Sequence, residues 1–199
     1  MLSSLRQSTL TYSVSSSFLH SASFRLINPR HHQIGTDCVS QTLPASKVAG
    51  LDDEQLLARF TAGFFCGAVF SFERWLLWSG NGKILPVGYT GKQTSYCLFS
   101  TAVLMKGFNK PQTAIWKASE IPNTHLLPIG TRLFGSFLLV DKHISEDADQ
   151  PSYVDYGFGS DTSGFSGCHR MQVSRIQGTD SSEEALLEID WFTMGNDYR

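Results

Sequence analysis

Four segments with the composition of β-strands follow one another between Thr131 and Thr193, and they restrict the fold of this 199-residue chain more than any other feature. Each is rich in aromatic and aliphatic residues, and short polar or glycine-rich breaks separate them. The second half of the chain is therefore predicted to form a β-sheet. The segments are TRLFGSFLLVDKH (131–143), SYVDYGFGS (152–160), CHRMQVSRI (168–176) and ALLEIDWFT (185–193).

Three of these strands carry their apolar residues on one face, because side chains alternate between the two faces of a strand. The fourth places Leu187, Ile189 and Trp191 opposite Glu188 and Asp190, whereas the first segment is apolar on both faces. The pattern predicts an α+β domain in which an antiparallel sheet of about four to six strands packs on helices from the first half. The apolar faces of the second and third strands hold Val154, Tyr156 and Phe158, and His169, Met171 and Val173.

A mostly apolar segment with a helical start signal precedes the sheet. Asp52 and Gln55 have the spacing of a capping box, in which each side chain bonds the backbone at the start of a helix. Gly63 and Gly67 follow, and the uncharged part of the segment has 13 residues, fewer than the roughly 20 that a membrane span needs. We therefore expect a buried helix, or two short helices broken near the glycines. A membrane-associated helix over residues 60–78 is the alternative.

Charge and cysteine content exclude several classes of function. The net charge of −2 argues against nucleic acid as a partner, because phosphate binding needs a clustered basic surface. Residues 141–199 hold four Lys or Arg and twelve acids, so the acidic half of the sheet is expected to face solvent. The cysteines lie far apart without metal-ligand spacing, which predicts reduced, mostly buried thiols, no metal and no cofactor. They are Cys38, Cys66, Cys97 and Cys168.

The first 48 residues differ in composition from the rest of the chain. Nine serines fall within the first 23 positions, and Arg6, Arg25 and Arg30 supply positive charge in a stretch that has no acid before residue 37. This composition is typical of an organellar transit segment, and a disordered tail explains it equally well. Residues 1–48 are accordingly left outside the predicted fold, a single domain over 49–199. The protein is expected to be intracellular, either mitochondrial or cytoplasmic.

The order of elements resembles that of the START-like, or helix-grip, superfamily, which includes polyketide cyclases and binders of lipids and other hydrophobic molecules. The resemblance covers residues 130–193: a strand that begins Gly130-Thr131, an aromatic and glycine-containing strand that ends in a loop, a strand with the residues HRMQV (169–173), and a closing apolar strand. A helix-rich segment marked by tryptophans precedes them. The resemblance implies a curved sheet that grips a helix around an apolar cavity.

Tyr156 and His169 are the predicted acid–base pair. His169 shares a strand face with Met171 and Val173, and a histidine pKa near neutrality suits proton transfer. Tyr156, on the preceding strand, would donate to a carbonyl oxygen. Cys168 is adjacent to His169 and so on the opposite face, which argues against a Cys–His nucleophile pair. The other predicted ligand contacts are Asp155, Arg170, Glu73, Arg74 and Trp75.

The loop GSDTSGFSG (159–167) is the densest cluster of glycines and hydroxyls in the chain, and it includes Asp161, Ser163 and Ser166. It is not a nucleophile elbow, since no GxSxG occurs, and it lacks the Lys-Ser/Thr of a P-loop. Its backbone amides could hold an anion. Turn chemistry between two strands explains the glycines more simply, so we expect a turn.

Together these features predict a domain that binds a small hydrophobic molecule. One hypothesis is a metal-free cyclase, dehydratase or isomerase that uses Tyr156 and His169 on a polyketide-like or lipid-like substrate. A second is a non-catalytic carrier with the same cavity. A third is a membrane-associated organellar protein whose helix 60–78 lies in or on a bilayer.

Overall fold

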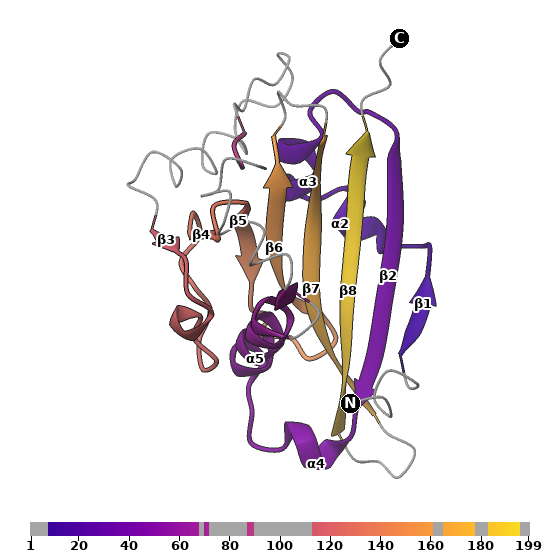
Figure 1. Ribbon diagram of the computed structural model, residues 1–199. Helices are drawn as coiled ribbons and strands as arrows, with labels where there is room; N and C mark the ends of the chain where they lie inside the picture. The colour runs from indigo at the N-terminus through magenta and orange to yellow at the C-terminus, as the bar shows by residue number, and fades with distance from the viewer. Residues whose placement is uncertain are drawn as a thin grey trace.

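A computed structural model describes residues 8–67, 70–71, 87–89, 113–160, 165–177 and 183–195. These residues form one sheet in the order β1-β2-β8-β7-β6-β5-β4-β3, with helices on both faces (Figure 1). The α+β class is confirmed, but the described sheet has eight strands rather than four to six, and it is mixed because β3 and β4 are parallel. The elements are β1 (Thr9–Thr11), α2 (Ser16–Leu19), α3 (Ala22–Ile27), β2 (Ile34–Leu43), α4 (Ala45–Val48), α5 (Asp53–Cys66), β3 (Ala114–Ile115), the 3-10 helix η1 (Ala118–Glu120), β4 (Arg132–Leu133), β5 (Phe137–His143), β6 (Ser152–Gly159), β7 (Phe165–Gln177) and β8 (Glu183–Gly195).

Strands β5 to β8 pair as consecutive antiparallel neighbours, and only the first predicted segment differs from expectation. Phe134 and Gly135 have positive φ angles of 52° and 76°, and the Ser136 amide donates to the Leu133 carbonyl. This turn divides the segment into β4 and β5, which pair with each other. The apolar run predicts one continuous strand because phenylalanine rarely adopts a left-handed backbone, so a phenylalanine at position 134 gives no sign of a turn.

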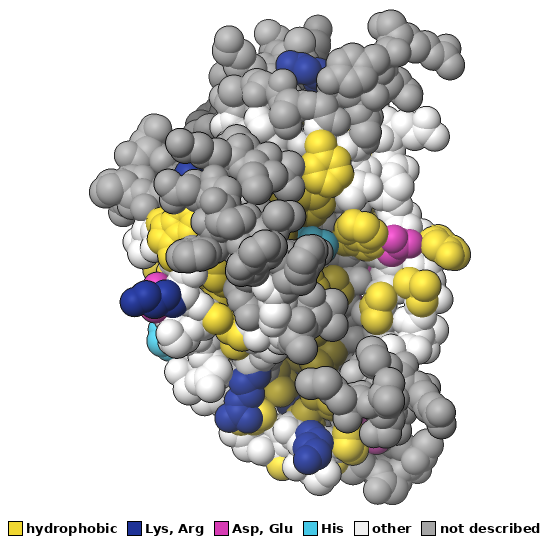
Figure 2. Space-filling view, viewed as in Figure 1, with side chains coloured by type: hydrophobic (Ala, Val, Ile, Leu, Met, Phe, Trp, Pro, Cys, Tyr) yellow, Lys and Arg dark blue, Asp and Glu magenta, His cyan; other side chains and the backbone are white. Residues whose placement is uncertain are grey.

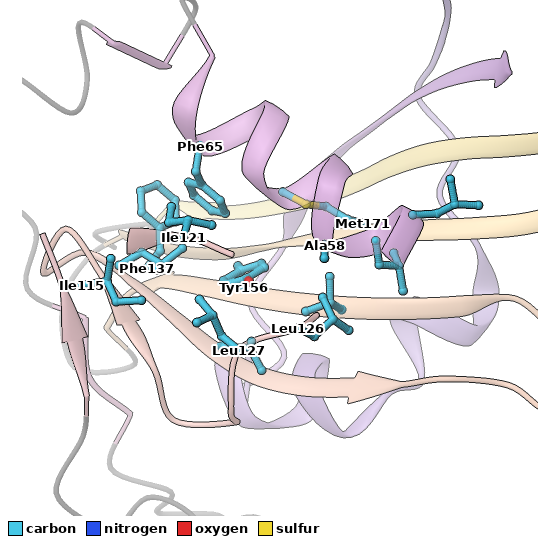
Figure 3. Packing of buried hydrophobic residues seen from close by; sticks show 14 of the residues in the cluster. Ala58, Phe65, Ile115, Ile121, Leu126, Leu127, Phe137, Tyr156 and Met171 are labelled. Atoms are coloured by element: carbon cyan, nitrogen blue, oxygen red, sulfur yellow. The ribbon is translucent and has the colours of Figure 1, made fainter. Parts of the chain in front are cut away.

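Helix α5 covers one face of β5, β6 and β7, and the main hydrophobic cluster lies between them (Figures 1 and 3). Leu57 and Phe65 of the helix are fully buried there, as are Tyr156 of β6 and Met171 of β7. The predicted apolar strand faces point into this layer, which confirms their alternation. The other buried strand residues of the cluster are Ile115, Leu133, Phe137, Leu139, Val154, Phe158, Val173 and Ala185.

Helix α5 begins and ends at signals that the sequence contains. Gln55 N donates to Asp52 Oδ1 at 2.8 Å, and Asp52 N donates to Gln55 Oε1 at 3.3 Å, which confirms the capping box. The helix ends at Cys66, and Gly67 caps it with an extended backbone. Within the described ranges, no helix has the length and apolar character to cross a bilayer. Most of the segment from 67 to 78 lies outside those ranges.

The N-terminal segment belongs to the sheet, so the prediction that residues 1–48 lie outside the fold is wrong. Strand β2 pairs with β8 along its whole length, from Ile34 opposite Met194 to Leu43 opposite Ala185, and β1 pairs with β2. A Ser- and Arg-rich composition indicates that a segment is polar. It gives no indication that the segment pairs with a strand far away in the sequence. The transit role of this segment stays a prediction.

Helices α2 and α3 cover the second face of the sheet (Figure 1). The Phe18 ring of α2 lies 5.4 Å from the Phe192 ring of β8, and Asp155 and Asp190 beneath these helices are 0% and 3% exposed. The expectation that this acidic half faces solvent is therefore wrong for Asp155 and Asp190, which helices of the N-terminal segment cover. Glu146, Asp147 and Asp149, between β5 and β6, are exposed as expected. The buried cluster on the second face comprises Phe18, Leu26, Ile27, Val87, Leu138, Val140, Cys168, Phe192 and Met194.

Candidate functional site

Tyr156 and His169 lie directly opposite each other on β6 and β7, so both side chains occupy the face that carries α5. Trp191 of β8 lies opposite His169, and Asp37 of β2 lies opposite Trp191. The four residues form one row across four strands. The structure thus brings the predicted pair together and adds Asp37, which sequence reasoning misses because its strand has the composition of a tail.

Aromatic side chains surround His169. Its ring stacks on Trp191 with 5.8 Å between centroids and 5° between planes, and the Phe158 centroid is 5.0 Å away. Phe64 and Phe137 lie at 5.5 Å and 6.0 Å. The residue is half-buried, and its Nδ1 atom has no hydrogen-bond partner among the described residues. Burial lowers the pKa of His169 to about 4, so the imidazole is neutral at pH 7.

A glycine lets Phe158 approach His169. Gly167 lies opposite Phe158 across β6 and β7, and a Cβ atom at Gly167 would come within 2.4 Å of the Phe158 ring and 2.2 Å of the Phe192 carbonyl oxygen. Such distances are too short for any side chain. Gly167 therefore provides the space in which the Phe158 ring lies beside His169.

Tyr156 is fully buried under α5, with its ring 5.0 Å from the Phe65 ring (Figure 3). The Thr61 hydroxyl lies near the Tyr156 hydroxyl and donates to Met171 Sδ at 3.5 Å. Burial raises the pKa of Tyr156 well above its usual range, and Thr61 offsets this effect only in part. The phenol is protonated at neutral pH and enclosed by the core.

Beyond α5, apolar residues on the same face reach the surface. Ile189 of β8 lies opposite Val39 of β2, which in turn lies opposite Leu10 of β1. Val39 is 41% exposed and Leu10 is 59% exposed, while Leu187, Ile189 and Trp191 are half-buried. Figure 2 shows hydrophobic side chains gathered on this side of the molecule. We refer to Leu10, Val39, Leu187, Ile189 and Trp191 as the β8–β2 surface.

A carboxylate borders the β8–β2 surface. Trp191 Nε1 donates to Asp37 Oδ2 at 2.6 Å, which holds the indole ring and the carboxylate in a defined arrangement. Asp37 is half-buried. The site therefore combines a neutral imidazole, an indole and a carboxylate in one row, next to aliphatic side chains in the row below.

Asp155 and Arg170, which were predicted to contact a ligand, lie on the opposite face and bind each other. Arg170 Nε and Nη2 donate to the two Asp155 oxygens, each at 2.8 Å, and the two side chains are 2% and 0% exposed. The guanidinium also lies over the rings of Tyr153 and Phe18, at 3.8 Å and 4.7 Å from their centroids. We interpret this pair as a structural contact that holds the Phe18 helix on the sheet.

Several ionisable groups near the Asp155–Arg170 pair have raised pKa values. Burial and then the Asp155 charge raise the pKa of Asp141. Burial and then the Asp190 charge raise the pKa of Glu188. Burial, assisted by Asp190, raises the pKa of the Cys38 thiol to about 12. These groups share a covered, acid-rich environment, which favours the protonated state of each.

Other predicted residues fall into two groups. Glu73, Arg74, Trp75, Asp161 and Ser163 lie outside the described residues, as does Cys97. Ser166 is buried on β7, and the Ser160 amide donates to the Phe165 carbonyl at 3.2 Å, so the loop they flank joins two paired strands, as expected for a turn. The described thiols of Cys38 and Cys168 are free, and the Cys66 thiol donates to the Ala118 carbonyl at 3.3 Å. Among the described residues, no group of His, Cys, Asp and Glu could hold a metal ion.

Comparison with protein-family models, curated protein sequences and solved structures finds no match to this chain. The fold and the site therefore define the protein at the level of class: an α+β protein with a mixed sheet covered by helices on both faces. The resemblance to the START-like superfamily stays a prediction.

Proposed function

We propose that this protein binds a small hydrophobic molecule, lipid-like or polyketide-like in character, on the β8–β2 surface beside α5. The observation that carries the proposal is the solvent exposure of apolar side chains on this sheet face, led by Val39 and Leu10. Contiguous exposed apolar patches mark interaction sites. A guest that covers this patch removes apolar area from water, which contributes about 25 cal/mol per Å².

The aromatic end of the surface supports a guest with a flat or ring-containing part. His169 and Trp191 are stacked, and Phe158 lies against the same imidazole. Rings held in this way offer a rigid surface for offset stacking with another ring. Because the imidazole is neutral at pH 7, it presents no positive charge to attract an anionic guest.

Binding without catalysis is the form of the proposal that we favour. A general acid or base works best with a pKa near the operating pH, and burial lowers the pKa of His169 to about 4. The Tyr156 hydroxyl is enclosed by the core, so it has no path to a molecule on the surface. Acid–base catalysis by this pair would need both groups to change environment.

Titration with the neutral fluorescent probe N-phenyl-1-naphthylamine tests the proposal, because its emission rises in an apolar site. We expect saturable binding to the full chain. Val39→Thr keeps a β-branched side chain but replaces a methyl group by a hydroxyl, and we expect it to weaken binding about three- to fivefold, as the loss of one buried methyl group predicts.

Ile144→Thr is the matched control, because Ile144 is 38% exposed, close to the 41% of Val39, but follows the end of β5. We expect this variant to bind the probe as the unmodified chain does. Absence of saturable binding to the full chain, or equal weakening by the two substitutions, would contradict the proposal.

A further inference from the structure

We propose that the molecule bound on the β8–β2 surface carries a cationic group, such as an ammonium, that pairs with Asp37. The inference deepens the proposed function and rests on it. The proposed function concerns the apolar part of the ligand, which contacts the β8–β2 surface. The inference concerns the polar group of the same ligand.

The first argument is the unfilled bonding capacity of Asp37. Its Oδ2 atom accepts from Trp191 Nε1 at 2.6 Å, and its other oxygen has no hydrogen bond or ion pair with any described residue. A carboxylate has room for about four hydrogen bonds. The free oxygen can therefore accept from an ammonium without loss of the bond that holds the indole.

The second argument is the charge of the surroundings. Along β2, β7 and β8, Arg175 is the only positively charged residue among the described residues that share this face. Arg175 Nε is bonded to Asp53 Oδ1 at 2.8 Å, near the start of α5. His169 is neutral at pH 7. A cation beside Asp37 thus meets no neighbouring positive charge among the described residues of its row, whereas a carboxylate there would face Asp37 without a counter-ion.

The third argument is the indole itself. Trp191 is half-buried, and its ring carries negative potential on its faces. An ammonium at the Asp37 carboxylate lies within reach of this ring, so one cation is stabilised both by the carboxylate and by the aromatic face. The hydrocarbon part of the same molecule extends over Ile189 and Val39, in the adjacent row.

Three probes with the same eight-carbon chain separate these contributions: octylammonium, octan-1-ol and octanoate. Each is used below its aggregation concentration and is measured by displacement of N-phenyl-1-naphthylamine from the full-length protein. We expect the cation to bind about five- to tenfold more tightly than the alcohol, as an exposed ion pair with a cation–π contact predicts, and octanoate to bind most weakly.

Asp37→Asn keeps an oxygen that accepts from Trp191 but removes the charge, so we expect it to abolish the preference for the cation and to leave the alcohol affinity unchanged. Glu146→Gln is the control, since it makes the same change in net charge at an exposed position, and it should retain the preference. Octanoate binding as tightly as the cation, or a preference that survives Asp37→Asn, would overturn the inference. If the neutral dye and the alcohol also fail to bind the full chain, the proposed function itself fails.

Discussion

The Asp155–Arg170 pair is the residue-scale contact with the largest expected energetic effect. Both side chains are almost wholly inaccessible, and the guanidinium is enclosed between Tyr153 and Phe18. The two buried charges neutralise each other, and neither side chain can be solvated by water instead. The intact pair therefore adds little to the free energy of unfolding, whereas removal of one of its two residues lowers that free energy strongly.

We expect Arg170→Met to lower the free energy of unfolding by about 3–5 kcal/mol, because it leaves the Asp155 carboxylate buried without a partner. The double variant Asp155→Asn/Arg170→Met should lose less than this single variant. Urea unfolding at neutral pH measures both. Arg175→Met provides the comparison, since its bond to Asp53 is partly exposed and should cost about 1 kcal/mol. Equal losses for Arg170→Met and Arg175→Met would refute the interpretation.

The contribution of His169 to stability depends on pH, because burial lowers the pKa of this residue. Its folded-state pKa of about 4 lies below the ordinary value of 6.5, so between these values the unfolded chain binds more protons than the folded one. Stability from this residue is therefore fully present above pH 6.5 and is lost as the pH falls toward 4. The total effect is at most about 3 kcal/mol.

We expect His169→Phe to reduce the loss of unfolding free energy between about pH 7 and about pH 5, because a phenyl ring stacks on Trp191 without titrating. Chemical denaturation at the two pH values gives the difference. His143→Phe, at an exposed histidine of β5, should retain the loss seen in the unmodified chain. The assignment to His169 is wrong if both variants keep the same pH dependence.

At the scale of elements, α5 shows how much of a helix can be read from its residues. The capping box at Asp52 and Gln55 and the break near the glycines are both predicted from the residues and present in the helix. They follow from local chemistry: a side chain reaches backbone amides three residues away, and glycine weakens a helix wherever it occurs. By contrast, the turn at Phe134 and Gly135 depends on β4 pairing with β5, and the residues there predict a continuous strand.

The two glycines of α5 should respond differently to alanine. A Cβ atom at Gly63 would meet nothing within 4 Å, whereas a Cβ atom at Gly67 would lie 2.5 Å from the Gly63 carbonyl oxygen. We expect Gly63→Ala to stabilise the protein by about 0.5–1 kcal/mol, the usual gain from glycine to alanine inside a helix. Gly67→Ala should destabilise it. Thermal unfolding of the two variants, which have the same composition, provides the comparison, and a gain in both would show that Gly67 does not set the end of the helix.

At the scale of the whole molecule, the N-terminal segment completes both the sheet and its second layer. Strand β2 is the neighbour of β8, and Phe18 of α2 packs on Phe192 of β8 and on Arg170 of β7. Without this segment, one edge of β8 and the cluster that contains Met194 would be open to water. The segment is therefore expected to be required for folding, whether or not its composition also serves as an address.

We expect deletion of residues 1–48 to abolish cooperative thermal unfolding, because it removes β2 together with α2 and α3. Deletion of residues 1–7, which precede β1, is the control and should leave the transition unchanged. Near-ultraviolet circular dichroism during heating reports the packing of the aromatic residues. A cooperative transition in the larger deletion would show that residues 49–199 fold alone.

Local features of this protein follow from its residues: which segments of the second half are strands, which side chains share a face, and where α5 starts. Alternation and capping act over a few positions, so the order of residues is enough to place Tyr156 and His169 on the apolar faces of neighbouring strands. Folding of distant segments onto each other determined that β2 joins β8, that Asp37 meets Trp191, and that Asp155 is covered rather than solvated. Pairing between distant strands depends on which surfaces meet in the folded chain. Short-range patterns of charge and hydropathy therefore do not predict which strand pairs with which.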